Sequence, residues 1–297
     1  MKTRIKISYL LAFMISIWLM SCNDDKINFT SNDSENVQNE TVSDSYVDDA
    51  DDISSVALSS DDATLNGKVS SSGRRVFKVI DVAKRLDCAE VSIERDSLAT
   101  VPTGIITIDF GTGCTDVRGN VRKGIIRIRY NGRRFIANST VETTFDGYSI
   151  NDIILEGTRT ITNITGSTEE YPKFTIVVTG GKTTWPDGTF ATREVNRTRE
   201  WIRDTNPSQD LWINTGTASG TNRKGYNYSM VITKPLVFKR ECSSDRKRKE
   251  FIAVEGTKEL TVDGKLIVID YGDGTCDNTI TITINGTSKE VEVNGDN

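Results

Sequence analysis

Histidine is absent from all 297 residues of the chain. Without an imidazole there is no Ser-His-Asp triad, no Cys-His nucleophile pair and no His-ligated zinc or haem site. Carboxylate pairs and Ser-Lys pairs survive this exclusion, but the commonest hydrolytic mechanisms do not. A pair such as Asp152 and Glu156 has the chemistry of a glycosidase, yet nothing in the sequence fixes its separation. We therefore expect no catalysis and no cofactor.

Proline is scarce as well, with 5 residues, whereas β-branched residues are frequent throughout the last two-thirds of the chain. This composition is typical of strands joined by tight turns, so the expected class is all-β. A large basic excess is also missing. Residues 23–62 carry ten Asp, two Glu and one Lys, a net charge of −11, which leaves residues 63–297 at +3. Such a nearly neutral body gives no reason to expect a nucleic-acid partner.

An apolar run near the amino terminus is too short to cross a bilayer. It extends from Ile7 to Met20, and as a helix it reaches about 21 Å against a hydrocarbon core of about 30 Å. The run ends in Leu-Met-Ser-Cys, which resembles the lipobox of bacterial lipoproteins. We expect residues 1–21 to be a signal peptide and Cys22 to carry acyl chains such as palmitate. The alternative is an ordinary secretory signal with a chance cysteine.

Residues 22–70 follow as an acidic segment. The residues after the cysteine, Asn23-Asp24-Asp25, resemble the surface-export signal of Bacteroidota lipoproteins. The segment is poor in apolar residues and repels itself, which predicts a disordered tether with a span of about 35 Å for forty residues. The expected location is the outer membrane, with the body exposed on the cell surface.

The body, residues 71–297, alternates in hydrophobicity between turn signals. Ile280, Ile282 and Ile284 share one face of a strand and threonines share the other, as in a half-buried strand. We predict an antiparallel meander of about a dozen strands, forming a curled sheet, a sandwich or a barrel. Val76 to Cys88 can form a strand or a short helix, and the apolar spacing weakly favours the helix. The predicted type I′ hairpin turns are Asn131-Gly132, Asp146-Gly147, Asp187-Gly188, Asp263-Gly264 and Asn285-Gly286.

Residues 191–202 are polar on both faces of a predicted strand. The favoured interpretation is a solvated sheet with cross-strand ion pairs, and the alternative is a strand that lines a polar concavity. Nearby tryptophans offer rings that can stack on sugars. The candidate ligand face consists of Trp185, Arg193, Arg197, Arg199 and Trp201.

Two stretches of the chain repeat one another. Residues 107–116 read TIDFGTGCTD and residues 268–277 read VIDYGDGTCD, and each has a cysteine upstream. Four cysteines remain once Cys22 is acylated, and they allow three disulfide connectivities in an exported protein. Because each unit, 88–132 and 242–286, places one cysteine before a hairpin and one after it, the repeat favours two local bridges. These bridges are Cys88 with Cys114 and Cys242 with Cys276.

Two smaller hypotheses concern the loops. Asp270, Asp273 and Asp277 resemble an oxygen-rich calcium loop, although tight turns explain these aspartates equally well. Asp96-Ser97-Leu98 resembles the acceptor of Bacteroidota protein O-glycosylation, which makes Ser97 a candidate modification site.

Taken together, the lipobox, the acidic segment, the duplicated loops and the Gly-Thr-Arg-Thr run at 157–160 resemble a group of Bacteroidota surface lipoproteins. The resemblance covers the mature body and implies location and fold class, but no activity. The favoured function is a membrane-anchored binding or adhesion module for a glycan, peptide or envelope component. The alternatives are a structural or lipid-carrier protein of the envelope and, less favoured, a His-independent glycosidase.

Overall fold

The computed structural model describes residues 33, 36, 37, 74–77, 86–96, 101–116, 119–132, 136–164, 171–243, 252–277 and 279–292. Residues 1–21, Cys22 and Ser97 lie outside the described residues, so the signal peptide, the acylation and the glycosylation stay predictions. The elements are β1 (Arg74–Phe77), β2 (Glu90–Arg95), β3 (Thr103–Asp109), β4 (Cys114–Thr115), β5 (Val121–Asn131), β6 (Thr140–Ile150), β7 (Ile153–Asn163), β8 (Lys173–Thr184), β9 (Phe190–Ile202), η1 (Pro207–Gln209), β10 (Leu211–Thr221), β11 (Asn227–Lys239), α2 (Arg240–Ser243), β12 (Glu255–Val262), β13 (Lys265–Asp273), β14 (Thr279–Ile284) and β15 (Thr287–Glu292).

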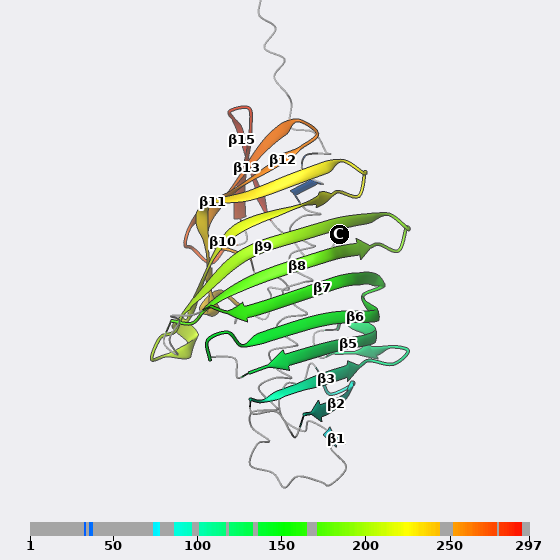
Figure 1. Ribbon diagram of the computed structural model, residues 1–297. Helices are drawn as coiled ribbons and strands as arrows, with labels where there is room; N and C mark the ends of the chain where they lie inside the picture. Colours follow the sequence, from blue (N-terminus) through cyan, green and yellow to red (C-terminus); the bar gives the residue numbers. More distant parts are fainter. Residues whose placement is uncertain are drawn as a thin grey trace, which may run out of the picture.

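All described strands belong to one antiparallel sheet, which confirms the predicted class and the meander (Figure 1). Each strand pairs with the next along the chain from β1 to β15, except that the two-residue β4 pairs with β5 beside β3. The order does not return to its start, so the sheet is open. This result selects the curled single sheet over the sandwich and the barrel.

The strand connections alternate between two rims of the sheet because neighbouring strands are antiparallel. Rim 1 holds the β6–β7, β8–β9, β10–β11 and β12–β13 turns, on the right in Figure 1, and rim 2 holds the connections between them. Side chains at opposite ends of one strand, one at each rim, therefore lie far apart. β9, with 13 residues, is about 40 Å long.

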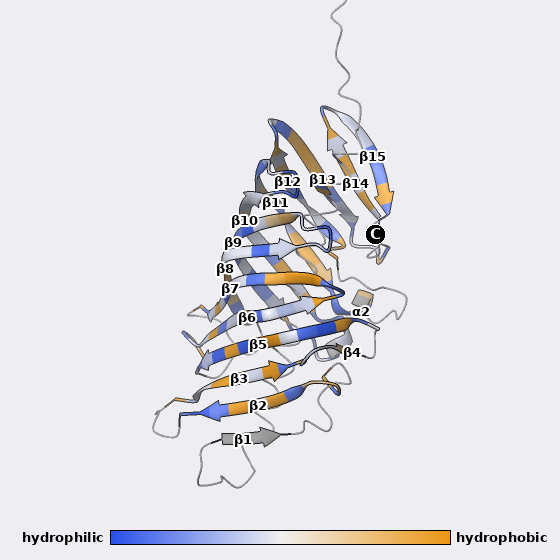
Figure 2. Cartoon of the chain, turned by 90° about the vertical axis from the view of Figure 1, so that its right-hand side faces the viewer, coloured by the Kyte–Doolittle hydropathy of each residue, from blue (hydrophilic) through white to orange (hydrophobic). Residues whose placement is uncertain are grey.

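One face of the sheet, which we call the inner face, is buried across its whole width. The pairing register carries one row of directly opposed residues over twelve strands, and every member is at most 7% exposed. From β2 to β14 the row is Ile93, Ile106, Ile128, Thr143, Arg159, Val178, Val195, Ala218, Met230, Leu260, Ile267 and Ile284. The alternation of apolar and polar residues that produces this face is visible along β2 and β5 in Figure 2. The opposite face we call the outer face.

Apolar packing on the inner face is concentrated towards the two ends of the sheet. One cluster extends from Leu86 and β2 to β7, and the other extends from β8 to β14. Even within the second cluster a cation is buried: Lys258 is 1% exposed and its Nζ lies 5.5 Å from the centre of the Tyr271 ring. The centre of the sheet, β7 to β10, carries most of the polar inner residues.

Three residues of the acidic segment are helical and lie against the body (blue in Figure 1). Asp33 is 1% exposed, and Val37, 3% exposed, belongs to the apolar cluster of β8 to β14. The solvated tether predicted for residues 22–70 is therefore wrong at these positions. The weakly favoured helix at 76–88 is also wrong where the chain is described, because residues 76 and 77 belong to β1.

Two of the five predicted type I′ turns are confirmed. Asp263-Gly264 and Asn285-Gly286 have positive φ at both residues, as a type I′ turn requires. In contrast, Asp146-Gly147 lies inside β6, where the register shifts and the strand bulges against β5. The actual β6–β7 turn is Asn151-Asp152, with φ of 51° and 64°. At Asn131-Gly132 and Asp187-Gly188 only the glycine has positive φ, so longer connections form there.

Candidate functional site

Strand β9 places arginines on the inner face of the sheet. Arg193 and Arg197 are 5% and 8% exposed, and Val195 between them is 7% exposed. The interpretation of β9 as a strand with two solvated faces is therefore wrong for the odd-numbered residues. It holds for the even-numbered ones, where Glu200 on the outer face pairs across strands with Lys173 at 3.0 Å.

Four arginines of β7 and β9 share the inner face, and we call Arg159, Arg193, Arg197 and Arg199 the arginine strip. Arg159 is 3% exposed and lies in the row that also contains Val178 and Val195. The sequence did not reveal Arg159 as a member because strand pairing, rather than local pattern, brings β7 and β9 to either side of β8.

Backbone bulges open a small cavity inside the strip. At Gly157 and Gly181 the strands β7, β8 and β9 approach so closely that a Cβ atom at either position would collide with the neighbouring backbone. The cavity beside them is lined by Arg159 and Arg193, and its volume is about 20 Å³. That volume suits about one water molecule, so the cavity is no binding site for a sugar or a peptide.

The strip ends at rim 2 in an aromatic pair. Arg199 donates from Nε to Asn214 Oδ1 at 3.1 Å, and the rings of Trp201 and Trp212 stack with centroids 5.9 Å apart. Trp201 Nε1 donates to the buried carboxylate of Asp210 at 3.1 Å. Trp201 is therefore fixed in the inner layer by packing and by a hydrogen bond.

Trp185 lies at rim 1, about 35 Å along β9 from Trp201. The guanidinium of Arg223 covers its ring at 4.4 Å and pairs with Asp187 at 2.7 Å. Hydrogen bonds from the hydroxyl and amide of Thr189, aided by Arg223, hold the pKa of the Asp187 carboxyl below its ordinary value. The candidate ligand face thus divides into a buried strip with Trp201 and a separate rim residue, Trp185.

The outer face carries a regular array that the sequence analysis missed. Five directly opposed threonines cross β6 to β10, and we call this row the threonine ladder: Thr140, Thr162, Thr175, Thr198 and Thr215. All five are half-buried or exposed. Thr160 and Thr217 extend the array in the adjacent row. Each threonine can be found in the sequence, but their alignment in one row depends on the strand register. Bulges in β6 and β8 shift that register.

The carboxylates considered for a glycosidase have separate partners on the outer side. Glu156 pairs with Lys182 at 2.9 Å, and Asp152 in the β6–β7 turn pairs with Lys123 at 2.6 Å. Each is solvent-exposed and engaged by its own lysine.

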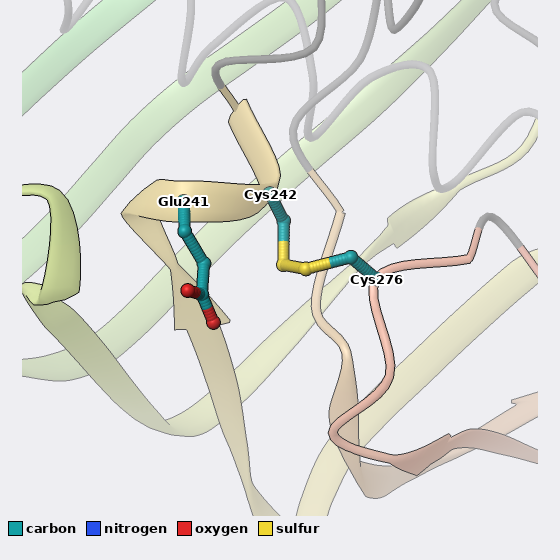
Figure 3. Close-up of side chains that lie close together, drawn as sticks. All are labelled: Glu241, Cys242 and Cys276. Carbon is teal, nitrogen blue, oxygen red and sulfur yellow. A yellow bond between two sulfur atoms is a disulfide. The ribbon is translucent and has the colours of Figure 1, made fainter.

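The disulfides connect as the repeat predicted, Cys88 with Cys114 and Cys242 with Cys276, with Cα–Cα distances of 5.6 and 5.3 Å. The first lies at rim 1 and the second at rim 2. Glu241 lies beside the second bridge (Figure 3). Within the described part of the chain this trio alone has three metal-type ligand atoms close together, and both of its cysteines are oxidised.

The aspartates of the suggested calcium loop do not converge. Asp270 accepts the Gly272 amide at 2.9 Å, and Asp277 accepts the Thr279 amide at 3.0 Å. Asp273 accepts both the hydroxyl and the amide of Thr275, which lower the pKa of its carboxyl. Each carboxylate therefore stabilises its own turn. In the first copy of the repeat Asp109 accepts the Gly111 amide in the same way, at 2.7 Å.

No protein-family model, curated protein or solved structure matches the chain. Among the described residues, no helix has the length and apolar character needed to cross a membrane.

Proposed function

We propose that the chain is a lipid-anchored binding or adhesion protein of a bacterial outer membrane, attached through Cys22, and that it binds a glycan on the outer face. The proposal rests on the threonine ladder. Neighbouring strands lie about 4.8 Å apart, so the ladder presents hydroxyls at a regular spacing across five strands. Each hydroxyl donates and accepts hydrogen bonds, as the hydroxyls of a sugar chain do.

The two faces differ in what they offer to a ligand. Inner-face arginines and apolar residues are buried, whereas outer-face residues such as Thr215 and Asn196 are exposed. A ligand that meets the folded body thus meets hydroxyls, amides and the ion pairs Lys173–Glu200 and Lys182–Glu156. These groups suit a neutral, hydroxyl-rich partner better than a nucleic acid or a lipid.

Glycan-array binding with the lipidated protein in detergent tests the proposal. We expect the parent chain to bind a subset of glycans, and the triple change Thr175→Val, Thr198→Val and Thr215→Val to abolish that binding. Valine keeps the shape and the β propensity but removes the hydroxyl. The matched control changes Thr261, Thr279 and Thr281, outer-face residues beyond the ladder, to Val and keeps binding. An array without signal at high protein density contradicts the glycan proposal, and absence of palmitate labelling contradicts the anchor.

A further inference from the structure

The described part of the N-terminal acidic segment contacts rim 1 of the sheet. Asp33 pairs with Lys265 at 3.2 Å, with the Asp33 side chain 1% exposed. Asn36 accepts a hydrogen bond from the side-chain amide of Asn222 at 2.7 Å. Lys265 follows the β12–β13 turn, and Asn222 belongs to the β10–β11 turn. Among the described residues, the contact nearest in sequence to Cys22 therefore lies at rim 1.

The short chain between this contact and Cys22 limits how the body can stand on a bilayer. Eleven residue steps from Cys22 to Asp33 span at most about 37 Å. If the strands stood upright with rim 2 against the bilayer, Asp33 would lie about 40 Å from it, the length of β9. An acylated Cys22 does not reach across that distance, but it reaches the bilayer when rim 1 is the nearer rim.

Rim 1 also exposes large apolar side chains. Five of them in the described part of the chain lie in a rim 1 connection or within two residues of one, and each is between 37% and 49% exposed. We call these five the apolar fringe: Val121, Ile154, Phe190, Tyr226 and Leu266. Rim 2 exposes Val101, Ile136 and Tyr171 as well. The length of the N-terminal chain, rather than apolar exposure alone, therefore distinguishes the two rims.

Cations lie over two aromatic rings of rim 1. Lys182 Nζ lies 5.4 Å from the centre of the Phe190 ring, and the guanidinium of Arg223 covers the Trp185 ring at 4.4 Å. Each cation also pairs with a carboxylate near the same rim, so these acidic groups are neutralised locally. At the boundary between lipid headgroups and acyl chains, aromatic rings occupy the apolar side and long cationic side chains extend towards the phosphates. Rim 1 therefore carries the side chains that suit a phospholipid interface.

We propose that rim 1 lies against the lipid bilayer and that the apolar fringe enters its interfacial layer, so that the sheet stands upright with rim 2 away from the membrane. This orientation depends on the acylation of Cys22 in the proposed function. It keeps the threonine ladder clear of lipid, because Thr198 lies eight residues along β9 from Phe190, a distance of about 26 Å. The surface proposed to bind a glycan then faces the medium.

Fluorescence quenching by brominated phosphatidylcholine tests the orientation, with the lipidated protein in vesicles. Phe190→Trp puts a probe in the fringe, and Tyr171→Trp puts a matched probe at rim 2, where the parent side chains are 49% and 44% exposed. After subtraction of the parent signal, we expect quenching of the Phe190→Trp probe to exceed that of the Tyr171→Trp probe at least threefold, because bromine quenches only rings near the acyl chains. Equal quenching, or stronger quenching at Tyr171→Trp, overturns the orientation.

A second pair of variants tests whether the fringe contributes to the contact. In the Phe190→Trp background, Ile154→Ser with Leu266→Ser is expected to reduce quenching at least twofold, because interfacial binding scales with the apolar area buried. The control, Val101→Ser with Ile136→Ser, removes two exposed apolar side chains from rim 2 and keeps the quenching. Quenching that survives the rim 1 change overturns the role of the fringe.

Flotation of the same vesicles distinguishes failure of this orientation from failure of the lipid anchor. Protein that floats with the vesicles while its Phe190→Trp probe stays unquenched overturns the orientation and leaves the anchor in place. Protein that does not float contradicts the acylation of Cys22 and overturns both. The glycan array contains no vesicles, so its result does not depend on the orientation.

Discussion

Asp116 and Arg122 form a fully buried ion pair in the first half of the body. Both side chains are 0% exposed, and Asp116 Oδ2 accepts from Nε and Nη2 of Arg122 at 3.1 Å each. Arg122 Nη1 donates to the Tyr148 hydroxyl at 2.5 Å, and the other oxygen of Asp116 accepts the Asn120 amide at 3.0 Å. A dense set of hydrogen bonds therefore compensates the desolvation of both charges.

Because the pair is buried, removal of one partner leaves an uncompensated charge. We predict that Asp116→Ala lowers the free energy of unfolding by about 3–5 kcal/mol, measured by urea denaturation. The exposed pair Lys123–Asp152 offers a control, since its side chains are 42% and 66% exposed. Asp152→Ala is expected to cost less than about 1 kcal/mol. Equal losses in the two variants would show that Arg122 finds another partner.

In two Asp-x-Thr turns, hydrogen bonds from the threonine lower the pKa of an exposed aspartate carboxyl. Asp187 and Asp273 each accept a hydroxyl and an amide hydrogen bond from the threonine two residues on, which lowers the pKa of both. A lowered pKa in the folded state stabilises the protein above the ordinary pKa of 3.8. This stabilisation is lost as the pH falls through the folded pKa.

We predict that Thr275→Val raises the pKa of Asp273 towards its ordinary value, because valine removes the hydroxyl donor. A titration that follows the carboxyl carbon by NMR measures the change. Asp187, whose partner Thr189 is untouched, serves as the reference in the same spectra. An unchanged Asp273 midpoint would assign the shift to the Thr275 amide and Lys239 instead.

At the scale of elements, the duplicated cysteine units fasten both ends of the meander. Each bridge ties the segment before a hairpin to the loop after it, β2–β3 in the first unit and β12–β13 in the second. The separations of 26 and 34 residues correspond to about 3–4 kcal/mol each in the chain-entropy model. The bridges thus stabilise two hairpins that pair with the sheet near its ends.

We predict that the losses in the free energy of unfolding caused by removing the two bridges add. Cys88→Ser with Cys114→Ser should lower the free energy of unfolding by about 3–4 kcal/mol, and so should the corresponding change at Cys242 and Cys276. Urea denaturation of the two double variants and the quadruple variant measures this. If the free energy lost in the quadruple variant differs greatly from the sum of the losses in the two double variants, the two ends of the sheet are coupled.

The meander and the cysteine pairing could be predicted from the sequence because both depend on local signals. Alternation predicts which residues share a face, and a repeat predicts which loops resemble each other. Glycine pairs were less reliable. Asp146-Gly147 reads as a hairpin turn, but Gly124 on β5 approaches the Gly147 backbone so closely that the two glycines form a bulge. The reversal then falls at Asn151-Asp152, where two non-glycine residues adopt positive φ.

At the scale of the whole molecule, the sequence could not predict which face of each strand is buried at the centre of the sheet. Arg193 and Arg197 look solvated by composition, and only their position in the inner rows of a wide sheet reveals burial. The same holds for Asp33, whose partner Lys265 lies 232 residues away. If Cys22 is acylated, the eleven residue steps from Cys22 to Asp33 span at most about 37 Å, which limits the distance between the anchor and this contact.

Among the described strands β15 pairs only with β14, and this edge strand has features that oppose pairing with another chain. Lys289 lies on the inner face opposite Ile282, while Glu290 and Glu292 lie on the outer face. Inward-pointing charge on an edge strand discourages edge-to-edge association. We predict that Lys289→Val with Glu290→Val produces concentration-dependent association, measured by sedimentation velocity against the parent chain.

The matched control for this edge changes Arg129 and Glu142, an exposed pair on the interior strands β5 and β6, to Val. That change also replaces one cation and one carboxylate, but both neighbouring strands are already paired, so no free ladder is available. Association of the β15 variant alone assigns the effect to the free edge. If both variants associate equally, added surface hydrophobicity rather than strand pairing is the cause, and the charges of β15 have no protective role.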